Sequence, residues 1–150
     1  MEEQRELGMK WFKFLVYFGL WAGAVLNFID GINLLTGAVY EAEGVSAELV
    51  YYTYPQLREN DMFFGLVAIG IAIYQGYTAY SLLKFKQVAP KLLTILYCLS
   101  ISWSFFYAIF TSSILGESLM GEVIGSIIAG AIMLVINYIY FKNRKHLFVY

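Results

Sequence analysis

Carboxylate and carboxamide side chains stand close to the ends of the long apolar segments of this 150-residue chain. Their oxygen atoms are hard ligands, which suit them to attract or loosely hold a cation. Gathered at one end of a bundle of membrane helices, such groups predict a polar mouth for an ion or a small solute. The residues of this predicted mouth are Asn27, Asp30, Asn33, Asn60, Asp61 and Glu122.

The same residues also have a structural interpretation. Asp61 and Glu122 stand where helices are predicted to begin, and there a carboxylate interacts with unpaired backbone N–H groups and with the positive end of the helix dipole. Asn33 can help to end the first helix. The sequence therefore leaves two readings open: helix capping with hydration, or a site for an ion or solute.

Cysteine and histidine are too scarce for most metal and redox chemistry. The only cysteine is Cys98 and the only histidine is His146, which excludes an internal disulfide, a haem held by two histidines of one chain and a zinc cluster. We therefore expect no cofactor and no metal site.

Catalytic constellations are absent as well. The apolar segments contain no histidine and a single acid, Asp30, which argues against an intramembrane protease. Lipid phosphate transfer needs basic and acidic groups on one side of the membrane, and here they are separated along the chain. We expect no catalytic residue, no enzymatic activity and no nucleic-acid partner.

The elements that must position these residues follow from composition. Hydrophobic residues make up 60% of the chain and charged residues 14%, with a mean hydropathy of +0.64, outside the range of soluble domains. Charge-poor stretches of about 20 residues, at about 1.5 Å per residue, reach roughly the 30 Å of a hydrocarbon core. We predict an all-α integral membrane four-helix bundle, a single domain over 1–150, with spans at about 11–35, 62–83, 92–116 and 122–141 and an outer loop at about 36–61.

Basic residues predict the orientation of the spans. Lysine and arginine gather before the first span, between the second and third, and after the fourth, whereas the other two connections are acidic. Because cytoplasmic loops are rich in these cations, both termini are expected in the cytoplasm. A signal peptide cleaved near Ala22-Gly23-Ala24 is the competing interpretation of the N-terminal segment. The cations that carry the orientation are Arg5, Lys10, Lys13, Lys84, Lys86, Lys91, Lys142, Arg144 and Lys145.

The outer loop offers two arrangements. Ser46 can cap a short helix over 47–54 that lies on the membrane surface, and Pro55 ends it. The residues of this helix expected against lipid are Leu49, Tyr51, Tyr52 and Tyr54. Alternatively, Pro55 lies in the first turn of a long second helix that projects outward. The second arrangement is favoured.

Small residues at steps of four predict the faces on which the helices pack, because they let backbones approach closely in lipid. The resulting contacts form either within one chain or, through Gly121 and Gly125, between two copies. On a helical wheel Asp30 falls on the side of Gly19 and Gly23, so we expect it to face other helices. The predicted packing residues are Gly19, Gly23, Ala68, Ala72, Gly76, Gly121, Gly125 and Ala129.

Two stretches, "KWFKFLVYFGLWAGAVLNFIDGI" at 10–32 and "NYIYFKNRKHLFV" at 137–149, resemble small four-span membrane proteins of anaerobic Gram-positive bacteria. Some of those proteins carry a cytoplasmic zinc ribbon, whose cysteines this chain lacks. The resemblance covers nearly the whole chain, implies a bacterial plasma membrane and adds no catalytic residue.

These observations lead to two expectations of function. The first is a non-enzymatic membrane protein that acts by association, with itself or with another membrane protein. The alternative is a homo-oligomeric channel or carrier for a cation or small solute, entered through the polar mouth.

Overall fold

The computed structural model describes residues 8–150, and every regular element within them is helical. Arg5, one of the predicted cytoplasmic cations, lies outside the described residues. The elements in chain order are α1 (Lys10–Phe14), the π-helical turn η1 (Leu15–Gly19), α2 (Leu20–Thr36), α3 (Ala38–Ala42), α4 (Ala47–Thr53), α5 (Pro55–Leu83), α6 (Ala89–Leu115), α7 (Met120–Lys142) and the 3₁₀ turn η2 (Lys145–Leu147).

Four helical stretches are long and apolar enough to cross a membrane, as predicted: Lys10–Thr36, Pro55–Leu83, Ala89–Leu115 and Met120–Lys142. The protein is therefore suited to lie in a membrane. The second stretch begins at Pro55, whose fixed φ and missing N–H fit the first turn of a helix. The short helix expected on the surface is also present as α4, so the structure combines both arrangements considered for the outer loop.

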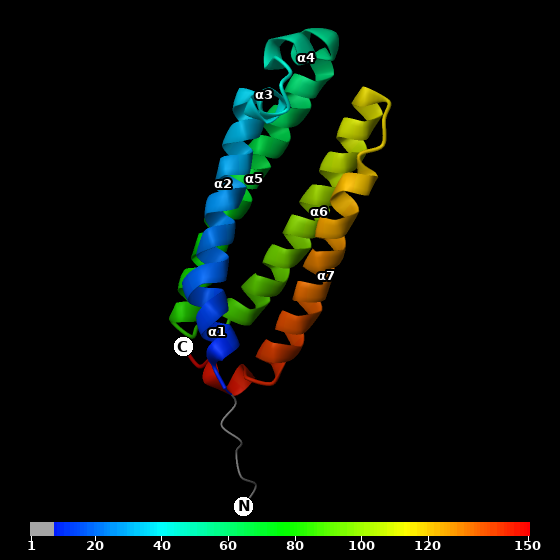
Figure 1. Cartoon of the computed structure of the whole chain (residues 1–150). Helices are drawn as coiled ribbons and strands as arrows, with labels where there is room; N and C mark the ends of the chain where they lie inside the picture. Colours follow the sequence, from blue (N-terminus) through cyan, green and yellow to red (C-terminus); the bar gives the residue numbers. More distant parts are fainter. Residues whose placement is uncertain (1–7) are drawn as a thin grey trace, which may run out of the picture.

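Charge separates the two ends of the helices. We call the end formed by α1, the α5–α6 connection and η2 the basic end, and the end formed by α3, α4 and the α6–α7 connection the acidic end. Figure 1 shows both described chain ends at the basic end and the helices α3 and α4 at the other.

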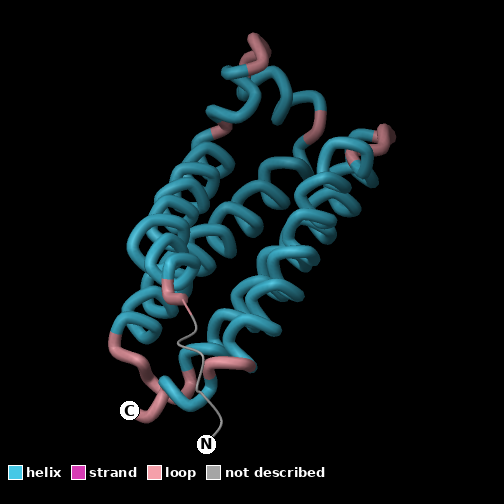
Figure 2. The backbone as a smooth tube through the Cα atoms, turned by 60° about the horizontal axis from the view of Figure 1, so that its bottom comes forward, coloured by secondary structure: helices cyan, strands magenta, loops and turns pink. Residues whose placement is uncertain are grey.

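The long helices pack in series. α2 lies along α5, α5 along α6, and α6 along α7. Figures 1 and 2 show the α2/α5 pair and the α6/α7 pair diverging toward the acidic end. As a result α7 has one principal neighbour, whereas α5 lies between two.

The closest backbone approach joins α2 to α5. A Cβ added to Gly31 would stand 2.8 Å from the carbonyl oxygen of Gly65, and one added to Gly65 would stand 2.9 Å from that of Gly31. Ala68 and Ala72 continue this seam as buried residues, and Gly23 lies against the amide of Gln75. Small residues thus pack α2 on α5, although Gly31 and Gly65 were not among the predicted ones.

The hydrophobic core concentrates at the basic end. Phe12 stacks on Phe85 with ring centroids 5.2 Å apart and meets Phe141 and Phe148 edge-on. In the same half, buried Asn137 accepts a hydrogen bond from Trp11 Nε1 at 3.0 Å and donates one to Tyr97 Oη at 3.2 Å. The first span therefore contacts α7 at the basic end, where the two helix pairs converge.

Candidate functional site

The acidic end carries a small helical cap, which we define as α3 and α4. Gly37 allows it to form, because its φ of +77° ends α2 in the left-handed conformation that favours glycine. A Cβ at this position would also stand 2.6 Å from the Cβ of Ala47, the first residue of α4. The chain therefore turns back at Gly37 and lays the cap over the start of α5.

Asp61 fastens the cap to α5. Its side chain is fully buried, and its Oδ2 accepts hydrogen bonds from Tyr40 Oη of α3 at 2.6 Å and from Tyr51 Oη of α4 at 3.2 Å. The two phenol rings meet edge-on. One carboxylate oxygen thus holds both helices of the cap, which is the tightest polar arrangement at this end.

The two phenols are less acidic than ordinary tyrosines. Burial raises the pKa of Tyr40 well above its usual value of 10, and the hydrogen bond to Asp61 and that residue's negative charge raise it further. Burial and then the charge of Asp61 raise the pKa of Tyr51 to about 12. Both groups therefore remain protonated donors at every physiological pH.

The second oxygen of Asp61 is unusual. Oδ1 is buried and has no hydrogen-bond partner among the described residues. The neighbouring Asn60 donates to Thr111 Oγ1 of α6 at 3.0 Å, and Phe64, one turn along α5, packs edge-on against Tyr107 of α6. The carboxylate therefore lies beside the α5–α6 contact with half of its hydrogen-bonding capacity unused.

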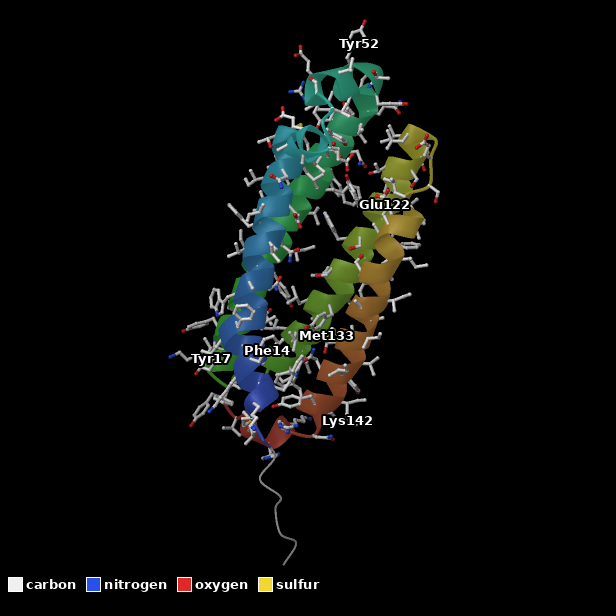
Figure 3. All side chains as sticks on the ribbon, in the orientation of Figure 1. Phe14, Tyr17, Tyr52, Glu122, Met133 and Lys142 are labelled. Carbon is white, nitrogen blue, oxygen red and sulfur yellow. The ribbon has the colours of Figure 1, made fainter. Side chains whose placement is uncertain are left out.

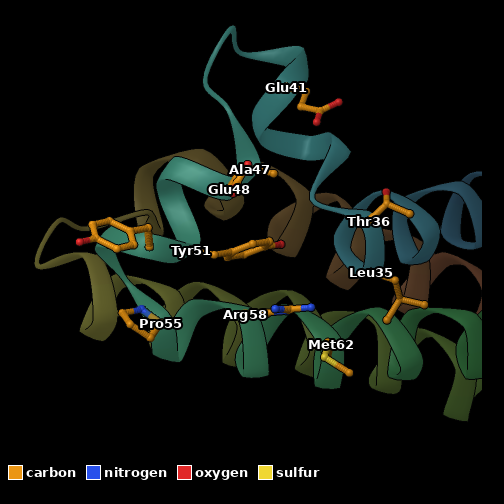
Figure 4. A pocket seen from close by; sticks show the side chains of 10 residues that line it. Leu35, Thr36, Glu41, Ala47, Glu48, Tyr51, Pro55, Arg58 and Met62 are labelled. Carbon is orange, nitrogen blue, oxygen red and sulfur yellow. The ribbon is translucent and has the colours of Figure 1, made fainter.

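A hollow of about 590 Å³ opens between the cap and α5. Tyr51 lies between α4 and α5 (Figure 4), and Arg58 of α5 also lines the hollow. Charges of both signs and apolar groups surround it, among them Glu41, Glu48, Leu35 and Met62. This lining offers both charged and apolar contacts to a small ligand.

The residues of the predicted mouth separate into different environments. Asn27 donates to Gln75 Oε1 at 2.8 Å within the α2–α5 seam, and Asn60 bonds α6. Asn33 is half-buried on α2, and Glu122 is exposed in the first turn of α7 (Figure 3). Among the described residues, no three of the types His, Cys, Asp and Glu gather closely enough to hold a metal ion.

Asp30 differs most from expectation. It is exposed, whereas we expected it to face other helices. The contact face of α2 follows Gly23, Asn27, Gly31 and Leu34, and Asp30 lies roughly 60° around the helix from Asn27, at about 100° per residue. Gly19 belongs to the π-helical turn, so it does not mark the face that α2 presents.

Tyr40 and Tyr51 are the site residues that the sequence did not identify. Tyr51 was expected against lipid, but it points inward to Asp61, while Leu49 and Tyr52 of the same helix are exposed. The partners are 10 and 21 residues from Asp61. Their only sequence signal is that they are tyrosines in the connection before α5, the helix that carries Asp61.

The glycine stripe of α7 is a second candidate surface. Gly121 and Gly125 have no atom within 4 Å of an added Cβ, and Ala129 is exposed. α7 contacts α6 through its opposite side, where Gly130 meets Ile101 and Asn137 meets Tyr97. The predicted stripe therefore has no packing partner in the described part of the chain.

Comparison with protein-family models, with curated proteins and with solved structures finds no match for this chain. Its function is therefore argued from the geometry above.

Proposed function

We propose that this protein acts by association within a membrane, through pairing of α7 with α7 of a second copy, and that it is not an enzyme. The acidic end faces outward and the basic end faces the cytoplasm, in keeping with the distribution of lysine and arginine. The open side of α7 is the observation that carries this proposal.

The open side has the spacing of a helix-pairing line. Its residues follow steps of four and three, which keep one face of a helix turned toward a partner. All of them are exposed, and they lie opposite the side that packs on α6. The line comprises Gly121, Gly125, Ile128, Ile132, Val135 and Ile139.

The residue types of this line favour association in lipid. Gly121 and Gly125 allow two backbones to approach closely, which increases van der Waals contact where the hydrophobic effect gives little. The β-branched residues below them have few χ1 rotamers to lose when they pack. The entropic cost of pairing is correspondingly small.

A second copy is the partner that fits this line best. Two-fold pairing places the same residues opposite one another, so each glycine pair meets a surface of the same shape. Elsewhere in the chain, Gly31 and Gly65 show how this sequence joins two helices through glycines. Gly121 and Gly125 offer the same kind of contact without a neighbour.

Disulfide crosslinking tests the pairing. In a Cys98→Ser background, because Cys98 is exposed, Ile132→Cys is expected to yield a crosslinked dimer in membranes under mild oxidation. Ile73→Cys on α5 is the matched control, since Ile73 is also a mid-helix isoleucine and is 68% exposed against 53% for Ile132. The dimer is measured by non-reducing gel electrophoresis.

A second substitution, away from the crosslinking position, tests the role of the glycines. Gly125→Ile, added to the Ile132→Cys variant, is expected to reduce the crosslinked fraction at least about fivefold, because the larger side chain holds the two backbones apart. Equal crosslinking at positions 132 and 73, or no effect of the added isoleucine, refutes the proposal.

The unpartnered oxygen of Asp61 favours a second candidate function, namely uptake of a cation at the acidic end. A buried carboxylate with unused acceptor capacity attracts positive charge. The hollow beside the cap gives a ligand access to the neighbourhood of Tyr51.

Flux through proteoliposomes tests this candidate. If it holds, wild-type protein carries Na⁺ or K⁺, Asp61→Asn abolishes the flux, and Glu122→Gln, which changes an exposed carboxylate, leaves it intact. An ion-sensitive dye inside the vesicles gives the measurement. Absence of flux in the wild type removes the candidate and leaves the pairing proposal untouched.

A further inference from the structure

A hollow of about 410 Å³ lies at the basic end between α6 and α7. The buried rings of Phe141 and Phe148 contribute an apolar lining. Thr94 of α6 and Tyr138 of α7 line it where the two helices continue into the span. The hollow therefore combines an apolar interior with a position near the expected surface of the membrane.

Three lysines from three elements also line this hollow: Lys91 of α6, Lys142 of α7 and Lys145 of η2. All three are exposed, and Lys142 is visible at this end of the molecule in Figure 3. The acidic side chains of residues 8–150 lie on the last two turns of α2 or at the acidic end. No acidic side chain in this part of the chain therefore neutralises the three ammonium groups.

Neighbouring cations at this end are engaged elsewhere. The guanidinium of buried Arg144 lies 3.7 Å from the centre of the Tyr140 ring and donates to the carbonyl oxygens of Gly8 and Tyr140. Lys84 and Lys86 lie over the Tyr80 ring, at 6.0 and 5.2 Å. The three lysines of the hollow are therefore distinct from Arg144, Lys84 and Lys86, which contact aromatic rings or backbone carbonyl oxygens.

We propose that this hollow binds the headgroup of an anionic phospholipid, such as phosphatidylglycerol. The lysines pair with the phosphodiester, as basic pockets between membrane helices do. The acyl chains lie along the apolar surface that begins at Tyr138 and continues over exposed Ile95 and Leu99 of α6. A free phosphate uses the lysines alone, whereas a lipid uses both the lysines and the apolar part of the hollow.

This site is separate from the proposed pairing line. Tyr138 and Phe141 lie toward α6, while the pairing line lies on the far side of α7. Lipid binding and dimerisation can therefore succeed or fail independently.

Native mass spectrometry of the whole chain in detergent tests the proposal, with phosphatidylglycerol, phosphatidylcholine and inorganic phosphate as probes. We expect the variant K91Q/K142Q/K145Q to bind phosphatidylglycerol about 100-fold more weakly than wild type, since each cation near an anionic lipid contributes roughly fivefold. The matched control K13Q/K84Q/K86Q also loses three positive charges, two at exposed positions and one at half-buried Lys86. It is expected to stay within about threefold of wild type.

Phosphatidylcholine is expected to bind the wild type much more weakly than phosphatidylglycerol, and millimolar inorganic phosphate is expected not to displace the lipid. Equal losses in the two triple variants indicate attraction to the basic end as a whole and overturn the proposal. Displacement by phosphate identifies a site for free anions and overturns it too. Far-UV circular dichroism verifies that both variants keep the helical content of wild type.

Discussion

Replacement of Gly65 by alanine is expected to lower the free energy of unfolding by about 2 kcal/mol, whereas the same change at Gly70 leaves it unchanged or raises it. The two glycines lie five residues apart on α5. A Cβ at Gly65 would stand 2.9 Å from the carbonyl oxygen of Gly31, while one at Gly70 meets no atom within 4 Å.

The sign of the stability change depends on whether the atoms opposite the added Cβ can move away. The atom opposite Gly65 is a backbone oxygen of α2, so relief requires the two helices to separate and to loosen the seam through Ala68 and Ala72. Overpacking of this kind typically costs about 1–3 kcal/mol. At Gly70 alanine brings only its higher helix propensity, worth up to about 1 kcal/mol.

Unfolding by sodium dodecyl sulfate in mixed micelles, followed by tryptophan fluorescence, measures both variants. Trp21 is a suitable probe because it lies beside Gly76 in the same seam. Gly31→Ala is expected to resemble Gly65→Ala, and the double variant to cost less than the sum, because both changes disrupt one contact. Equal stability of the Gly65 and Gly70 variants contradicts the described approach of α2 to α5.

Removal of the Tyr40 hydroxyl is expected to destabilise the cap by about 2 kcal/mol, as is typical for a hydrogen bond to a charged group. Tyr40→Phe deletes the 2.6 Å bond and leaves the buried carboxylate of Asp61 with Tyr51 as its remaining phenol donor. Tyr52→Phe on α4 is the control, since Tyr52 is 86% exposed. Hydrogen exchange of residues 47–53 measures cap opening, with an expected increase of about 30-fold for Tyr40→Phe and little change for Tyr52→Phe.

The cap also has a defined dependence on pH. A phenol with a raised folded-state pKa stabilises the fold fully below its unfolded pKa, and this stability is lost as pH rises through the folded value. With the pKa of Tyr51 raised from 10 to about 12, the cap is expected to hold to about pH 10 and to weaken toward pH 12.

The double variant Tyr40→Phe/Tyr51→Phe isolates this effect from the other tyrosines. Its stability at pH 8 is expected to be lower than that of wild type, and its further loss between pH 10 and 12 smaller. The measurement is detergent-induced unfolding at a series of pH values. A wild-type and a variant curve that fall in parallel exclude Tyr40 and Tyr51 as the titrating groups.

The sequence predicted the four spans because their signal is local. Charge-free length decides whether a helix can cross a membrane, and Pro55 marks the start of α5 by its own stereochemistry. The hydrogen bonds of Asn27 and Asn60 are harder to predict from the sequence. Each is bonded to another helix, as the cost of buried polar groups demands, but the partners Gln75 and Thr111 carry no signal that links them.

Which helices meet could not be predicted in the same way. Gly65 and Gly125 look alike in sequence, since each is a small residue within an apolar helix, yet one touches a neighbouring backbone and the other touches nothing. In lipid, apolar residues suit a lipid-facing side and a helix-facing side equally well. The three-dimensional arrangement of the helices therefore decides which glycine lies in a contact. It also decides which tyrosines of the cap reach Asp61.

The π-helical turn at Leu15–Gly19 gives the first span two different directions of contact. A π-helical turn accommodates one extra residue, which rotates the preceding turn by roughly 100° relative to an uninterrupted α-helix. Beyond the turn, Gly31 faces α5; before it, Trp11 reaches Asn137 of α7. The two parts of the first span therefore bind different helices, and this single span connects α5 of the first hairpin with α7 of the last.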